Sequence, residues 1–501
     1  MATPTTPAPP AALGAYTTSG LYTALEPTRE DRLRRSFLPL FRQYRRTEWF
    51  QNWAETFRCA PQAVFVPRTV EQCQMIVELA KREGKAIRAT GARHSPSDLW
   101  CTTGWMVRMN SMDKVLEIDT EKKTVTAQAG IILHALNKAL HGHGLALRNI
   151  GSISDQSLAG VITTATHGTG WAYQCMSGDV LQLTLLLASG EIVTCSRGER
   201  QDLFLASLCG LGATGLILSA KVQLEPSFRL RESREKRPFP DVVRDLDSLA
   251  GRSEHTRVWW NPQADTAMVM LANRTYEVPS PAKGSFFWGT VMGHWVVEFL
   301  LFVSLAIPSI TPGIGRLAAS LDAASAVVVD DSYNIFNLDC LFKQYTTEWA
   351  LPYENAAATL TELRAFLQAQ EKDPKGLRAH YPIEVRFSAP DDIWLSPSYG
   401  RQTVWIGIVM YKPYGYDVPW RKWFDAFEAL MLRQGGRPHW AKLHPLTPSE
   451  LSAMYPKFGA FKKVLEDVDP EGVFRNEYVK RHVFGELGGN EPEAFSRRVA
   501  R

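Results

Sequence analysis

Hydrophobic and polar positions repeat with two different periods between residues 64 and 224. One stretch carries apolar residues every three or four positions, which predicts a helix with a capping box at Thr69 and Gln72 that stops at Gly84. Other stretches alternate, or are short and apolar, as strands are. The pattern predicts strands over 64–67, 85–89, 115–119, 124–129, 181–188, 192–196 and 216–224, and further helices over 131–143 and 202–208. This mixture of elements indicates an α+β fold.

The middle of the chain, residues 230–435, has a different pattern. Alternating strands are predicted over 258–261, 267–271, 381–388 and 403–411, as in an antiparallel sheet. Residues 286–310 form the most apolar run of the chain and reach the length of about 20 residues that a bilayer span needs. A span would put the residues before 286 and those after 310 on opposite sides of a membrane. We exclude it because we expect glycine-rich loops before residue 230 to form one site with Lys442, as described below. Peripheral membrane contact or a buried helix are the two remaining interpretations.

Composition limits the class of protein. The chain has 501 residues, of which 45% are hydrophobic and 22% charged, enough for two or three globular domains. The net charge of +4 is too small to indicate a nucleic-acid partner. The seven cysteines include no Cys-x-x-Cys pair, which favours a reducing compartment over a disulfide framework. We expect no metal site.

The first 55 residues differ from those that follow. Residues 2–20 are rich in Pro, Ala and Thr and predict a flexible tail. Seven arginines among apolar residues over 29–46 predict a basic helix, which either packs on the domain or touches acidic lipid. The tail lacks the basic start of a secretory signal and the arginines of a transit peptide.

The stretch 87–97, IRATGARHSPS, combines a glycine turn with a histidine. Gly91 allows backbone angles that other residues resist, so successive N–H groups can form a nest suited to a pyrophosphate. His94 stands beside this turn with a nucleophilic imidazole. From the residues alone, the stretch is either a phosphate-binding loop or a surface turn with a hydrogen-bonded histidine.

Two further glycine-rich stretches follow. Small residues dominate 149–170, so either a flat ligand or a second backbone must pass close to it. Residues 210–215 match G-x-G-x-x-G, but this sequence lies between a predicted helix and a predicted strand. Because the dinucleotide fingerprint follows a strand and opens a helix, we interpret 210–215 as a tight turn.

Three charged residues are candidates for chemistry. Glu384 and Arg386 are two positions apart on a predicted strand, so they point to one face. One could accept a proton and the other could stabilise negative charge, although a surface cross-strand pair has the same pattern. Lys442, in PHWAK, is either a site residue or an ordinary solvated lysine, and His439 is expected to orient its neighbours.

Taken together, these stretches resemble a known group of flavoproteins. The loop at 91–97, the stretch 151–170 and the turn at 210–215 follow the order of the FAD-binding domain of vanillyl-alcohol-oxidase-type flavoproteins. The motifs IEVRF at 383–387, PHWAK at 438–442 and FRNEY at 474–478 make the chain similar to the sugar-1,4-lactone oxidases. That family includes L-gulonolactone oxidase and D-arabinono-1,4-lactone oxidase, and the resemblance covers nearly all of the chain after residue 55.

The resemblance implies the domain organisation and the cofactor. It implies a tail and basic helix (1–55), a two-subdomain PCMH-type FAD-binding domain (56–229), a cap with an antiparallel sheet flanked by helices (230–435), and a segment that returns to the FAD domain (436–501). It also implies FAD bound covalently through His94, while Arg93 stands where relatives often have Gly. The residues implied to contact FAD are Thr90, Gly91, Ala92, Arg93, His94, Ser95, Gly151, Ser152, Ser154, Asp155, Gly160, Thr164, His167, Gly168, Gly215 and Ile217.

The implied reaction is oxidation of an aldono-1,4-lactone, D-arabinono-1,4-lactone first, at C2 to an ascorbate-type product, with dioxygen reduced to hydrogen peroxide. Glu384, Arg386 and Lys442 would lie over the flavin ring. The alternatives are a sugar-alcohol oxidase, a cytochrome-coupled aldonolactone dehydrogenase, and a membrane-peripheral protein without catalysis. We expect an intracellular, membrane-associated protein, on the mitochondrial or endoplasmic-reticulum membrane, with residues 286–310 in contact with lipid.

Gly151 is relevant to whether dioxygen is the electron acceptor. The resemblance implies that a related plant dehydrogenase has Ala at this position beside the flavin, where a methyl group would block the approach of dioxygen. Glycine there favours an oxidase. The alternative is that Gly151 serves a turn that requires a positive φ.

Overall fold

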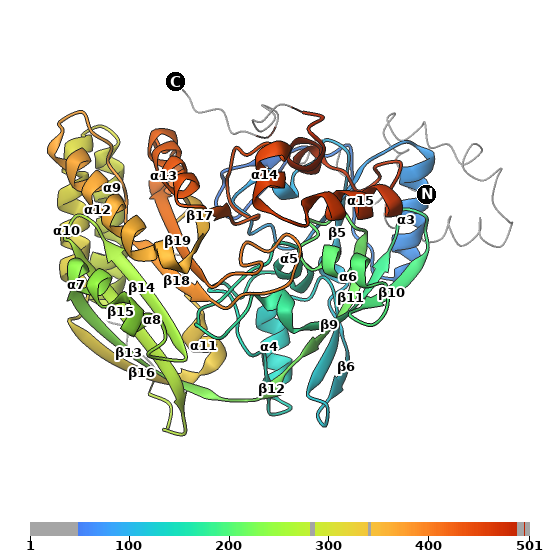
Figure 1. Cartoon of the computed structure of the whole chain (residues 1–501), viewed down its shortest axis with the longest axis horizontal. Helices are drawn as coiled ribbons and strands as arrows, with labels where there is room; N and C mark the ends of the chain where they lie inside the picture. Colours follow the sequence, from blue (N-terminus) through green and yellow to red (C-terminus); the bar gives the residue numbers. More distant parts are fainter. Residues whose placement is uncertain (1–48, 281–285, 339–341, 488–494, 496–501) are drawn as a thin grey trace, which may run out of the picture.

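A computed structural model of the chain describes residues 49–280, 286–338, 342–487 and 495. The basic helix predicted over 29–46 lies outside these residues. The mixed α+β class is confirmed, with two small sheets, a parallel sheet and two larger antiparallel sheets. We refer to residues 49–226 as the N-terminal domain and to residues 229–435 as the cap. In Figure 1 the cap lies beside the N-terminal domain, and the C-terminal helices lie over the latter.

The N-terminal domain begins with a parallel sheet of order β3-β5-β4 (Ala63–Phe65, Trp105–Arg108, Ile87–Thr90). Helix α3 (Val70–Arg82) connects β3 to β4 and buries the apolar face that the sequence predicts. The capping box is half correct. The Thr69 hydroxyl accepts the Gln72 N–H as expected, but the Gln72 side chain accepts from the Arg68 N–H instead of that of Thr69.

A second sheet in this domain is antiparallel and has the order β10-β9-β11-β7-β6. Its strands confirm the alternation in the sequence, and two-stranded sheets β1-β2 and β12-β8 lie beside it. The bounds are β6 Val115–Asp119, β7 Thr124–Gln128, β9 Val180–Leu186, β10 Ile192–Ser196, β11 Leu216–Gln223, β1 Phe50–Gln51, β2 Arg58–Cys59, β8 Leu145–Ala146 and β12 Glu225–Pro226. The helices are α4 Leu133–His141, α5 Leu158–Thr163 and α6 Gln201–Ser207.

The cap is built on an eight-stranded sheet of order β16-β13-β15-β14-β18-β19-β17-β20, antiparallel throughout. Helices cover its outer face in Figure 1, and there Phe239 of α7 stacks on Trp260 of β14 with ring centroids 3.9 Å apart. The strands are β13 Arg229–Pro238, β14 His255–Asn261, β15 Thr266–Thr275, β16 Ser325–Asp331, β17 Gln344–Pro352, β18 Ile383–Ser388, β19 Thr403–Tyr411 and β20 Arg437–Pro438. The helices are α7 Phe239–Arg244, α8 Leu246–Ala250, α11 Ser332–Phe336, α12 Ala356–Lys372 and α13 Arg421–Arg433.

The apolar run at 286–310 is helical. A π-helix (Phe286–Val296) leads into α9 (Val297–Ser304), and α10 (Thr311–Leu321) packs against α9. A small separate core holds this pair, yet Phe299 remains 54% exposed. Among the described helices, none combines the length and the apolar content required to cross a membrane.

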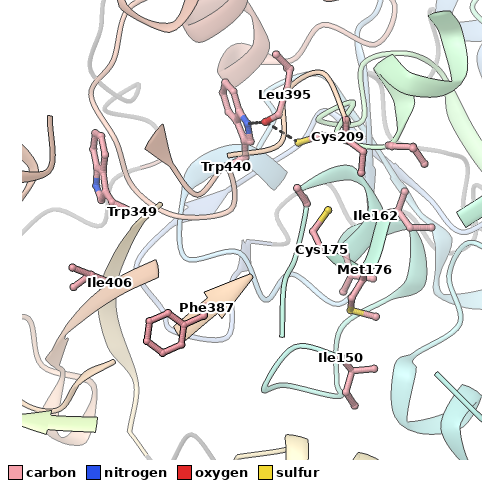
Figure 2. Close-up of a cluster of buried hydrophobic side chains, with 14 of the residues drawn as sticks. Ile150, Ile162, Cys175, Met176, Cys209, Trp349, Phe387, Leu395, Ile406 and Trp440 are labelled. Carbon is pink, nitrogen blue, oxygen red and sulfur yellow. Dashed lines mark hydrogen bonds between the residues drawn. The ribbon is translucent and has the colours of Figure 1, made fainter. Parts of the chain in front are cut away.

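The C-terminal segment joins both parts of the molecule. Strand β20 pairs with β17 of the cap, and further on the Val473 carbonyl accepts the Ile87 N–H of β4. Helices α14 (Pro448–Met454) and α15 (Phe458–Val468) lie between these two points, and α16 (Glu477–Val479) follows them. One continuous hydrophobic core connects the two domains. Figure 2 shows part of it, where Trp440 and Cys209 both donate to the Leu395 carbonyl.

Candidate functional site

The cap sheet presents a polar inner face toward the N-terminal domain. Glu384 and Arg386 of β18 point to this face together. Strand register adds neighbours on the same face: Trp259 and Arg257 stand opposite them on β14, and Glu348 of β17 stands beyond Gly407 of β19. Because register partners share a face, these charged side chains gather in one region at the interface between the domains.

Arg386 lies at the centre of this group and is only 7% exposed. Its Nη2 donates to Glu348 Oε1 at 2.5 Å, its Nε lies 3.3 Å from Glu384 Oε2, and its Nη1 donates to the Ser152 hydroxyl at 3.3 Å. Burial by itself would lower the pKa of Arg386, but the carboxylates of Glu348 and Glu384 keep it above its usual value. The guanidinium is therefore a fixed positive charge in the site.

Glu348 is the residue that the sequence analysis missed. It is 3% exposed and its Oε1 lies 3.2 Å from His167 Nε2. Burial by itself would raise the pKa of Glu348, but Arg386, together with His167, holds it well below its usual range. The available signal was a single carboxylate in the apolar run TTEWAL of β17, a strand that the pattern did not predict.

His167, Glu348 and His439 have the composition of a metal site, with three ligand atoms within 4.8 Å of one another. A cation already lies there, because Arg386 Nη2 is 2.5 Å from Glu348 Oε1 and 3.5 Å from His167 Nε2. Burial lowers the pKa of His167, and lowers that of His439 to about 3, so both rings are neutral near pH 7. These side chains therefore surround the Arg386 guanidinium and hold it in place.

The His94 loop follows β4, and its geometry corrects one expectation. Gly91 does not adopt a positive φ; it is required because a Cβ there would lie 2.0 Å from the Ser157 hydroxyl oxygen. Arg93 takes the left-handed conformation instead, with φ of 60°. The loop is held from outside, since the Trp53 N–H and the Asn52 amide donate to the carbonyls of Arg93 and Ser95.

The stretch 149–170 packs against this loop and against itself. A Cβ on Gly168 would lie 2.2 Å from Asn149 Oδ1, and a Cβ on Gly160 would lie 2.9 Å from the Ser157 hydroxyl. Gly151 also lacks a positive φ, so the turn explanation for it is wrong. The constraint there is the Thr166 methyl group, which a Cβ would approach to 2.9 Å.

Lys442 reaches the site through a tightly held segment. The Trp440 indole donates to the Leu395 carbonyl at 2.7 Å, and the Ser97 hydroxyl donates to the Ala441 carbonyl at 3.0 Å. The His439 N–H donates to the Glu348 carbonyl at 2.9 Å. Burial lowers the pKa of His94, and the charge of Lys442 lowers it further, against an opposing effect of Asp155. His94, Lys442 and Asp155 therefore lie in the same region.

The remaining predicted cofactor residues lie in three places. Thr90, Ala92 and Ser95 belong to the His94 loop; Ser154 hydrogen-bonds Asn337, and the Thr164 hydroxyl donates to the Gly160 carbonyl. Gly215 and Ile217 lie at the start of β11, where Gly215 has φ of +140° and abuts the Leu186 carbonyl. Their contact with a cofactor stays a prediction.

The residues present fit FAD. Buried polar atoms that make no hydrogen bond with any described residue include His94 Nδ1, Thr90 Oγ1 and Asn149 Oδ1. They lie in the two loops that the glycines bring together. Buried polar groups are usually paired, so this set indicates a bound partner with many hydrogen-bonding atoms.

Comparisons with known proteins indicate the family of the chain. The sequence model of an FAD-binding domain matches residues 61–196, and that of D-arabinono-1,4-lactone oxidase matches residues 220–482. An L-gulonolactone oxidase of Scyliorhinus torazame is 40% identical, over 87% of this chain and 98% of its own length. An L-gulono-1,4-lactone dehydrogenase of Mycobacterium tuberculosis is 32% identical, over 86% and 98%. A solvent-stable cholesterol oxidase has the same fold, with a TM-score of 0.74 at 20% identity, over 87% and 97%.

The FAD-binding domain and the similarity to lactone oxidases define an FAD-dependent oxidoreductase. Within that class, the chain belongs to the D-arabinono-1,4-lactone oxidase family. The model of that family matches more than half of the length of this chain. The resemblance inferred from the motifs is thereby confirmed.

Glu348→Gln is expected to lower turnover by about 10²–10³, the range for a lost electrostatic contact in a buried site. The reason is that Arg386 loses its closest negative partner and shifts. The measurement is steady-state turnover together with flavin content, which should stay near that of the wild type.

Glu428→Gln is the matched control. Glu428 is a second buried carboxylate, on α13, and it hydrogen-bonds Thr347, the neighbour of Glu348. Burial raises the pKa of Glu428 to about 8, so the group is already mostly uncharged at pH 7. Equal losses of turnover in the two variants would show that Glu348 has no special relation to Arg386.

Proposed function

We propose that the protein oxidises an aldono-1,4-lactone at C2 to an ascorbate-type product and passes the electrons to dioxygen, which becomes hydrogen peroxide. The observation that carries the proposal is the position of Arg386, which is hydrogen-bonded to Glu348 and lies beside Glu384. Lys442 and His94 lie in the same interface between the domains. The family supports the general reaction. FAD, when bound, supplies the two-electron acceptor for this chemistry.

The residues of the site suit the proton part of the reaction. The Glu384 side chain is 23% exposed and accepts from the Trp259 indole at 3.2 Å. One of its oxygens can therefore take the proton of the hydroxyl group on C2. Lys442 is the second candidate for that proton. The fixed charge of Arg386 stabilises the negative charge that develops on the substrate oxygen.

A panel of lactones assayed for peroxide tests this function, with D-arabinono-1,4-lactone first and gulono- and galactono-1,4-lactone beside it. Glu384→Gln and Arg386→Ala are each expected to lower turnover by about 10²–10⁴ with flavin retained. Turnover of sugar alcohols in place of lactones, or of lactones only with cytochrome c, would favour the corresponding alternative. Near-normal turnover in both variants would falsify the site assignment.

We also propose that FAD is bound covalently through His94. Support comes from its buried Nδ1, which makes no hydrogen bond with a described residue, and from burial that lowers the pKa of His94 and keeps the ring neutral and nucleophilic. His94→Ala should lose the covalent link but retain some noncovalent FAD. Mass spectrometry of the intact protein is the measurement, and a wild-type mass without FAD would refute the link.

Gly151→Ala tests the choice of oxygen as the acceptor. If Gly151 leaves a path for dioxygen, the variant reoxidises slowly in oxygen but still reduces an artificial acceptor. The clash with the Thr166 methyl complicates a single variant. The double variant Gly151→Ala, Thr166→Ser removes that methyl and is the control. Recovery of oxygen reactivity in the double variant would assign the effect to packing and would contradict the oxygen path.

We propose peripheral contact with an intracellular membrane, mitochondrial or endoplasmic-reticulum, through the helices at 286–310. Support comes from exposed Trp295, Phe299 and Ile307, with Tyr414 and Tyr416 beside α9. Apolar patches of this kind occur at membrane contacts. The double change Phe299→Glu, Ile307→Glu should abolish flotation with phospholipid vesicles. Leu116→Glu, at an exposed leucine of β6, is the control, and flotation that persists in the double variant would end the proposal.

A further inference from the structure

We propose that a cavity next to Glu384 binds the exocyclic hydroxyl groups of the lactone, and that Arg257 and His255 are the residues that recognise them. The cavity is small and lies between the inner face of the cap sheet and Thr169 of the N-terminal domain. This inference rests on the proposed function, since it names the part of the substrate that the reaction itself does not use.

Arg257 supplies hydrogen-bond donors to this cavity. Its side chain is 6% exposed, and its Nη2 donates to the Phe336 carbonyl at 3.2 Å. Its Nε and Nη1 make no hydrogen bond with any described residue, although Glu384 Oε1 lies 3.8 Å from Nε. A buried guanidinium with two such nitrogens is costly unless a ligand accepts from them.

His255 supplies an acceptor. Its Nδ1 lies 2.8 Å from the Thr169 carbonyl, which fixes the proton on Nδ1 and leaves a lone pair on Nε2. Nε2 is buried and makes no hydrogen bond with a described residue. Burial lowers the pKa of His255 to about 4, so the ring is neutral at pH 7 and the lone pair is retained.

Charges of both signs surround Arg257. The carboxylates of Glu384 and Glu232 act on it together with the guanidinium groups of Arg386 and Arg234. Glu232 is itself buried, and Arg234 donates to it at 2.6 Å. A neutral group can therefore bind without disturbing these pairs. A hydroxyl group, which both donates and accepts, matches Arg257 and His255 together.

The distances suit a lactone whose C2 lies at Glu384 and Arg386. Arg257 is the cross-strand partner of Arg386, and such partners lie about 5 Å apart. The exocyclic carbons of a 1,4-lactone leave the ring at C4, across the ring from C2. They therefore reach one strand further along the sheet, where the cavity lies.

A series of lactones of increasing length tests the inference. Erythrono-1,4-lactone has no exocyclic carbon, D-arabinono-1,4-lactone has one and L-gulono-1,4-lactone has two. Arg257→Met should lower kcat/KM for the two longer lactones by about 10–100-fold, the cost of losing hydrogen bonds from a charged group. Its effect on the four-carbon lactone should be small. Arg257→Lys should recover part of the loss.

Arg231→Met is the matched control, because it makes the same change at an exposed arginine on the opposite face of β13 from Glu232, and it should leave the order of the three lactones unchanged. Binding of a 2-deoxy lactone, which lacks the hydroxyl that is oxidised, should weaken in Arg257→Met. An equal loss of kcat/KM for all three lactones would overturn the inference, because Arg257 would then act only on Glu384. A wild type inactive with every lactone would instead refute the proposed function.

Discussion

The buried positive charge of Arg386 is the constraint on which the site depends. A guanidinium removed from water is destabilising unless carboxylates and hydrogen bonds compensate it, and removing one partner of such a pair is far more damaging than having neither. Glu348 and Glu384 supply the charge, from strands on either side of the one that carries Gly407. Ser152 and His167 supply contacts from the N-terminal domain. The same charge thus fixes both the register of the cap and its position on the N-terminal domain.

Close packing of backbone segments, in the His94 loop and the stretch 149–170, is the second constraint on the site. At Gly91, Gly151 and Gly168, a side chain is prevented by a neighbouring residue and not by backbone angles. Gly91 brings the His94 loop against Ser157, whereas Gly151 and Gly168 pack within the stretch 149–170 itself. Buried polar atoms of these two segments make no hydrogen bond with a described residue, and they are the groups that the cofactor is expected to satisfy.

Much of the fold follows from hydrophobic periodicity in the sequence. The strands of the five-stranded sheet, β3 and β4, and β14, β15, β18 and β19 of the cap were predicted, because each buries one face or both in a regular pattern. The central strand β5 of the parallel sheet was not. Glu348 and Arg257 were not, since their importance comes from cross-strand neighbours distant in sequence. Gly91 was identified for the wrong reason. Its contact with Ser157 is tertiary, whereas the left-handed angle falls on Arg93, a residue that rarely adopts it.

The Gly170 N–H donates to the Phe387 carbonyl at 3.1 Å, so the polypeptide of the N-terminal domain runs beside β18 as an added strand residue. A hinge movement that swung the cap away would have to break this bond, expose the shared core and separate Arg386 from Ser152 and His167. Such a movement of the cap is therefore energetically unfavourable. Entry of substrate and release of product would then depend on side-chain rotamer changes and loop fluctuations at the edge of the interface between the two domains. The identity of the side chains at this edge would therefore influence the rate.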